Sequence, residues 1–130
     1  MPAATQLPVH LTIAAATTTL ADALKADSIP VEKVVTRDGY IETPWFDTTG
    51  YARTTARPLG QRVVRVRAWI DPAQAGHSIV TLEGVYRLLA DPSLPGRELD
   101  RPLPPDHPVA LKLTQILKRL GEEYGETGAR

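Results

Sequence analysis

The sequence predicts one α+β domain in which helices cover one face of an antiparallel sheet. Three observations predict this class. The chain has 130 residues, the usual length of a single domain. Segments of alternating apolar and polar residues follow one another through turns, which favours hairpins over parallel crossovers. Two segments of helical periodicity lie near the ends. The expected order is β-α-β-β-β-β-α, with a long final helix across a curved sheet, an arrangement of the helix-grip type.

The first strand and the first helix are expected near the N-terminus. Residues 8–14 alternate in the manner of a half-buried strand. Residues 17–27 are expected to form a helix, since Thr19 followed by Asp22 approximates a capping box. Pro30 stops this helix, because a proline disfavours helical geometry in the residue before it.

A first hairpin is expected directly after Pro30. Residues 31–36 are rich in β-branched side chains, and residues 37–39 read Arg-Asp-Gly, a tight-turn signal. The returning strand covers residues 40–46. It either ends at Pro44 or lies on an edge, because proline cannot donate a hydrogen bond to a neighbouring strand.

The clearest hairpin joins residues 62–71 to residues 77–88. Both segments alternate with period two, so each should bury one face. If Asp71 lies opposite His77, the apolar faces meet and the outer face gains an ion pair. This register pairs Val66 with Leu82, Ala68 with Val80, and Arg65 with Glu83.

Residues 91–108 contain six of the chain's twelve prolines, a composition that resists both helix and central strand. We expect a stiff connection across the surface. Asp106 or His107 should then cap a final helix that has Pro108 in its first turn and ends at Gly121.

These elements predict a single folded domain over residues 8–121. Residues 1–7 read as a tether, and residues 122–130 are polar and expected to fray. Within the domain, residues 47–60 are rich in Thr, Gly and Arg and should form a flexible connection.

Composition argues against several classes of function. Fifteen basic residues balance fifteen acidic ones, so no overall field favours nucleic acid or an anionic membrane. The absence of cysteine excludes thiolate metal sites and cysteine nucleophiles. Three histidines lack metal-ligand spacing, and no serine or carboxylate pair has a catalytic context. We therefore expect no enzyme, no cofactor and no metal; an enzyme would need a cleft that gathers Asp71, His77 and an arginine.

One local pattern indicates a surface for binding another protein. Arginine and tryptophan alternate on the outer face of the predicted sheet, and these residue types concentrate binding energy at interfaces. An aromatic pair beside Pro44 is a second candidate anchor. The alternatives are a solvated face with cross-strand ion pairs, a core-closing aromatic pair, and a site for single-stranded nucleic acid or a lipid headgroup. The candidate docking residues are Arg65, Arg67, Trp69, Arg87, Trp45 and Phe46.

A composite pattern over residues 20–24, 29–34 and 37–43 resembles a known family. The most specific part is the hairpin Asp-Gly-Tyr-Ile-Glu-Thr at residues 38–43. It resembles the domain of the outer-membrane barrel-assembly lipoprotein of the BamC or NlpB type, and related bacterial envelope lipoproteins. This chain differs in having no cysteine to acylate, one domain rather than two, and a proline-rich connection.

The resemblance implies a domain that binds or scaffolds envelope proteins without catalysis, in the periplasm or at the outer membrane. No segment approaches the ~18 apolar residues of a spanning helix, and the opening residues would suit the tether of a trimmed lipid anchor. The alternative is a helix-grip protein, cytoplasmic or not, that binds a small apolar ligand or lipid. That alternative requires a cavity of ~300 Å³ or more between the sheet and the final helix.

Overall fold

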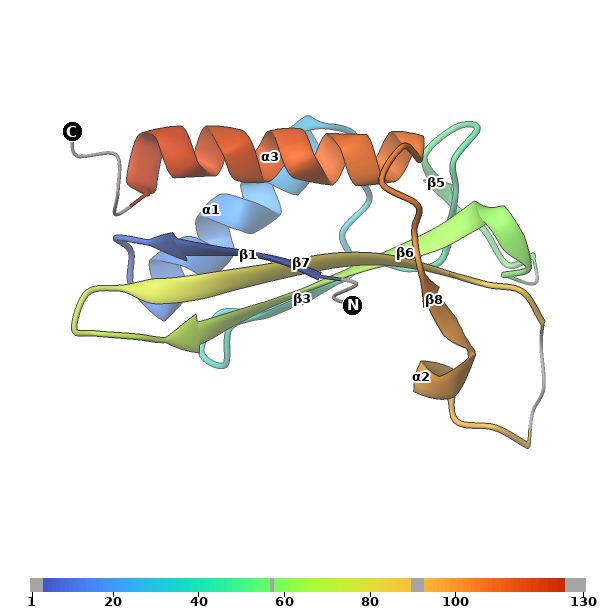
Figure 1. The fold of residues 1–130 in the computed structure, drawn as a ribbon, viewed down its shortest axis with the longest axis horizontal. Coiled ribbons are helices and arrows are strands. Elements are labelled where there is room, and N and C mark those ends of the chain that lie inside the picture. Colours follow the sequence, from blue (N-terminus) through green and yellow to red (C-terminus); the bar gives the residue numbers. More distant parts are fainter. Residues whose placement is uncertain (1–3, 57, 90–92, 126–130) are drawn as a thin grey trace.

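In the computed structural model, which describes residues 4–56, 58–89 and 93–125, two long helices lie on one face of an antiparallel sheet (Figure 1). The predicted α+β class is confirmed. Among the described residues the sheet has eight strands, five of them in the order β1-β7-β6-β3-β2; β4 pairs with β5 and β6, and β8 pairs with β7. The elements are β1 (Ala4–Val9), α1 (Ile13–Ala26), β2 (Lys33–Val35), β3 (Tyr40–Glu42), β4 (Phe46–Asp47), β5 (Ala52–Arg53), β6 (Gly60–Pro72), β7 (Ser78–Arg87), α2 (Gly96–Leu99), β8 (Asp100–Pro102) and α3 (Pro108–Tyr124).

The core lies between the inner sheet face and the helices α1 and α3. Alternate side chains of the two long strands β6 and β7 point into it, as the period-two pattern predicted. The core leaves no room for a side chain at Gly84, because a Cβ there would lie 2.6 Å from Leu103 Cδ1 and 3.4 Å from Leu113 Cδ1. The fully buried side chains include Leu20, Leu24, Ile41, Val64, Val66, Ile70, Val80, Leu82 and Ile116.

The first two elements begin earlier than predicted. Residues 4–7 belong to β1 and pair with β7, so they are not a tether; residues 1–3 lie outside the described part. The expected strand over residues 8–14 is cut short because Thr12 caps α1, its side chain accepting a hydrogen bond from Ala15 N at 3.2 Å. Thr19, the expected cap, lies inside the helix.

The first hairpin forms as predicted, with β2 and β3 antiparallel and β3 ending before Pro44. Its turn requires glycine for two reasons. Gly39 has a φ of +73°, and a Cβ there would lie 2.3 Å from Ile70 O. The backbones meet directly at this point, since Ile70 N donates to Gly39 O at 2.7 Å.

The connection over residues 47–60 is more ordered than predicted. It contains β5, which pairs with β4, while β4 also pairs with β6. Asp47 organises the turn between them, because its side chain accepts a hydrogen bond from Thr49 N at 2.7 Å. Short side-chain-to-backbone bonds of this kind leave no periodic trace in a sequence.

The predicted register of the long hairpin is wrong by two residues. Pro72 pairs with Ser78, so the loop is short, and His77 N closes it by donating to Gln74 O at 2.8 Å. Because the register shifts by an even number of residues, every side chain keeps its predicted face of the sheet and only its cross-strand partner changes. The observed pairs include Ala68 with Leu82, Ile70 with Val80, and Arg67, rather than Arg65, with Glu83.

The proline-rich connection over residues 91–108 contains structure that we did not predict. It forms the short helix α2 and the strand β8, which pairs with β7. Among the described strands β8 has only this one neighbour, and Pro102 is its last residue, a position where a missing N–H group costs little.

The final helix starts as predicted and ends later. His107, one of the two expected caps, accepts a hydrogen bond from Val109 N through Nδ1 at 3.1 Å, and its Nε2 donates to Gln61 O at 2.8 Å. Gly121 does not stop α3, which runs to Tyr124. A Cβ on Gly121 would lie 3.3 Å from Leu7 Cδ1, so this glycine lets β1 approach the helix. Of the tail that we expected to fray, residues 126–130 lie outside the described part.

Candidate functional site

The outer face of the sheet, opposite α1 and α3, carries most of the predicted docking residues. Along one cross-strand row Glu42 of β3 lies opposite Arg67 of β6, which in turn lies opposite Glu83 of β7. Opposite charges directly across a sheet stabilise the pairing. Arg67 therefore has a carboxylate on each side.

Asp100 of β8 joins the arginines of this face into one network. Its carboxylate accepts from Arg67 Nη2 at 2.9 Å and from Arg87 Nε at 2.8 Å, and Arg67 Nη1 also lies 3.3 Å from Glu83 Oε2. The Asp100 side chain is only 7% exposed. Burial alone would lower the pKa of Arg67, but the hydrogen bond and the charge of Asp100 raise it above its usual value.

Trp45 lies between two guanidinium groups. Arg65 Cζ and Arg87 Cζ stand 4.9 Å and 4.8 Å from the centre of its ring, within the range of cation–π attraction. Arg65 also donates from Nε to Thr43 O at 3.1 Å, and its burial lowers its pKa. The tryptophan thus contacts both arginines within the chain.

The two remaining predicted docking residues differ in burial. Phe46 is fully buried in the core, 5.8 Å from the Tyr51 ring, so it is wrong as an exposed anchor. β4 pairs with β6 opposite Val64, and this pairing carries the phenylalanine inward. Trp69 is half-buried on the outer face, tilted against Tyr40 at 5.9 Å.

The structure therefore brings Arg65, Arg67, Arg87 and Trp45 into one network with Asp100 and Glu83. The ion-pair interpretation predicted cross-strand pairs on this face, but with Arg65 opposite Glu83; the part played by Asp100 was not predicted. Two further arginines also have partners, Arg62 with Asp47 and Arg53 with Glu32. With Arg67 and Arg87 paired to carboxylates, the face offers little to a polyanion, and its role in docking stays a prediction.

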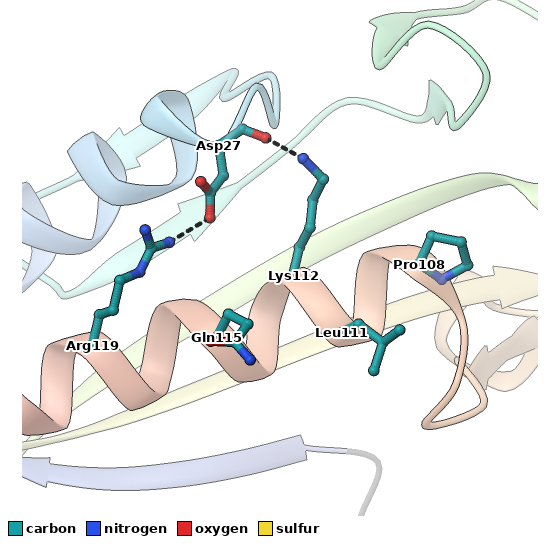
Figure 2. A pocket seen from close by; sticks show the side chains of 6 residues that line it. All are labelled: Asp27, Pro108, Leu111, Lys112, Gln115 and Arg119. Atoms are coloured by element: carbon teal, nitrogen blue, oxygen red, sulfur yellow. Dashed lines mark hydrogen bonds and ion pairs between the residues drawn. The ribbon is translucent and has the colours of Figure 1, made fainter.

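The helical layer carries a hollow of about 380 Å³ beside the N-terminal half of α3 (Figure 2). Its cations are engaged by the C-terminal end of α1. Lys112 Nζ donates to Asp27 O at 2.8 Å, and Arg119 Nη2 lies 2.6 Å from Asp27 Oδ2. Both cations thus lie at the C-terminal end of α1, where the helix dipole is negative and stabilises positive charge. This gives Lys112 and Arg119 a structural role.

A second hollow, of about 330 Å³, runs between α1 and α3 and has Ala23, Ile116 and Leu120 among its lining. Both hollows belong to the helical layer. Beneath α3, the side chains of Leu103 and Leu113 pack against Gly84, where the ligand-binding alternative expects a cavity.

The described part of the connection between β7 and β8, which includes α2, lies on the side of the sheet away from α3 (Figure 1) and exposes a group of leucines. Leu88, Leu89 and Leu94 are 61%, 50% and 41% exposed. We call these three residues, with Leu99 and the charged residues Glu98 and Arg101, the leucine patch; together the six line a hollow of about 80 Å³.

We did not predict the leucine patch, although one signal for it was present. Leu88 and Leu89 are consecutive, and neighbouring side chains of a strand point to opposite faces. A single buried face cannot hold both, so the doublet indicates at least one exposed leucine. The strand β7 in fact ends before it, at Arg87.

The histidines have structural positions. His10 and His77 stack with their ring centres 4.2 Å apart, and His107 caps α3. Within the described part of the chain, no three His, Asp or Glu side chains are grouped closely enough to hold a metal ion. In that same part, no helix combines the length and apolar character needed to cross a membrane.

Comparison with protein-family models and with curated proteins finds no significant match to this sequence. The resemblance to the barrel-assembly lipoprotein domain therefore stays a prediction.

Proposed function

We propose that this domain works by binding another protein, without catalysis, and that the leucine patch is the binding surface. The observation that carries the proposal is the exposure of Leu88, Leu89 and Leu94 on one projecting connection. Contiguous exposed apolar groups on a small domain typically mark interaction sites. Burying such side chains on association releases the water that they order.

The charges of the leucine patch favour a protein over a membrane or a nucleic acid. Among the described residues, its rim holds one acid, Glu98, and one base, Arg101. A polyanionic partner would select cations alone, whereas a protein surface can match both signs. A polar rim around an apolar centre is also the usual anatomy of a protein interface.

We propose further that the partner belongs to the bacterial envelope, so that the domain is periplasmic or associated with the outer membrane. This part rests on the sequence resemblance. It is supported by the order of elements, in which a helix leads into a hairpin, then into amphipathic strands and a closing helix.

The test compares two leucines of similar exposure. Leu88→Ser alters the leucine patch, while Leu111→Ser alters the outer side of α3, where Leu111 is 53% exposed. Both variants should fold. Affinity capture from a bacterial envelope fraction, quantified by mass spectrometry, should show the partner reduced about tenfold or more by Leu88→Ser and unchanged by Leu111→Ser. Equal recovery with both variants would remove the leucine patch as the binding surface.

A further inference from the structure

We infer that the leucine patch binds a second copy of this chain across a two-fold axis. The inference rests on the proposed function and names the partner. A two-fold interface uses the same surface on both copies, so that surface must be complementary to itself. The leucine patch meets this condition both in shape and in charge.

The shape condition is met by a protruding side chain beside a hollow. Leu88 is the most exposed large apolar residue of the described chain, at 61%. It borders a hollow of about 80 Å³, room for one aliphatic side chain, which the buried Leu99 also lines. Rotation about a two-fold axis places the leucine of each copy at the hollow of the other.

The charge condition is met by Glu98 and Arg101. Both line the leucine patch, and neither forms an ion pair with any residue that the structure describes, in contrast to Arg67 and Arg87 on the outer sheet face. In a two-fold dimer, Glu98 of one copy faces Arg101 of the other, and the contact occurs twice. The zero net charge of the chain adds no long-range repulsion between copies.

The experiment uses charge reversal, because it gives a result that a purely structural role would not. In Glu98→Arg both rim charges are positive, and in Arg101→Glu both are negative, so each variant alone should repel its own kind. An equimolar mixture restores both contacts, since the positive rim of one variant faces the negative rim of the other. Each variant should therefore be monomeric, and their mixture dimeric.

Sedimentation velocity from about 1 µM to about 1 mM provides the readout. We expect the unaltered chain to show a concentration-dependent monomer–dimer equilibrium, and Leu88→Ser to weaken it about tenfold or more. Glu122→Arg, a reversal at an exposed position of α3, is the matched control and should dimerise normally. Circular dichroism checks that each variant folds, and Leu94→Ser replaces Leu88→Ser if the latter does not.

Two outcomes would overturn the inference, and both are distinct from failure of the proposed function. If the unaltered chain stays monomeric throughout while Leu88→Ser still loses envelope partners, the second copy is excluded and the protein-binding function is retained. If the chain dimerises and each reversal variant alone dimerises equally well, the dimer uses another surface. Envelope capture that is insensitive to Leu88→Ser would instead contradict the proposed function.

Discussion

The outer face of the sheet and the leucine patch both contain arginine and acidic side chains, but of these two surfaces only the sheet face has them in ion pairs among the described residues. On the sheet face, Arg67 and Arg87 share the carboxylate of Asp100, and Arg65 stacks on Trp45. In the leucine patch, Glu98 and Arg101 lack ion-pair partners among the described residues, and leucines lie in solvent. The comparison teaches that arginine and tryptophan in an alternating pattern can be fully engaged within the chain, so that the pattern alone does not identify an exposed binding surface.

The difference has a geometric cause. Side chains across a sheet lie about 5 Å apart in fixed positions, so alternating charges on adjacent strands meet automatically. In the described part of the β7–β8 connection, residues 88–89 and 93–99 belong to no strand, and the backbone of α2 lies on the side of the sheet away from α3 (Figure 1). The side chains of Leu88, Leu89 and Leu94 there are therefore exposed to solvent.

The largest expected effect is the difference in unfolding free energy between a charge placed in the core and the same charge placed in the leucine patch. Val66→Asp places an unpaired carboxylate on the fully buried inner side of β6, while Leu88→Asp places the same group in solvent. The first should destabilise the domain by about 4 kcal/mol or more and unfold it, and the second by about 0.5 kcal/mol or less. Urea denaturation followed by circular dichroism measures both. A folded Val66→Asp variant would contradict the observed packing of β6.

An intermediate effect is expected at Asp100. Asp100→Asn keeps the shape but leaves Arg67 and Arg87, both less than 20% exposed, without the shared charge, and should cost about 2 kcal/mol. Glu98→Gln, two residues earlier in the leucine patch, should change the free energy of unfolding by less than about 0.5 kcal/mol. The two variants are compared by their urea denaturation midpoints, provided that their m-values are equal. Equal losses of unfolding free energy would mean that Asp100 is no better paired in the folded chain than Glu98.

The smallest effect concerns pH on the outer sheet face. Burial, together with the hydrogen bond that Tyr40 donates to Glu42, raises the pKa of the Tyr40 phenol from 10.0 to about 12. The folded state thus favours neutral tyrosine, so this contribution is complete below pH 10 and is lost as the pH rises from 10 to about 12. Unfolding midpoints should fall more steeply over that range in the unaltered chain than in Tyr40→Phe. Parallel slopes would show that the phenol carries no such linkage.

Part of the fold was predictable because it depends on local pattern. Period-two alternation located β6, β7 and the faces of their side chains, and an apolar stripe located α3. The turn at Gly39 was predictable because few other residues adopt its backbone conformation. Alternation cannot distinguish registers that differ by two residues, and so the pairing of Arg67 with Glu83 was missed.

The candidate site depended much more on tertiary structure. The sequence by itself determined that arginine and tryptophan share the outer sheet face, because that follows from side-chain alternation. Only the folded chain decided that Asp100 would neutralise them and that Phe46 would be buried, since both outcomes require contacts between distant segments. The exposure of the leucine patch was decided in the same way: β7 ends at Arg87, and the chain that follows leaves the sheet before its leucines can be covered.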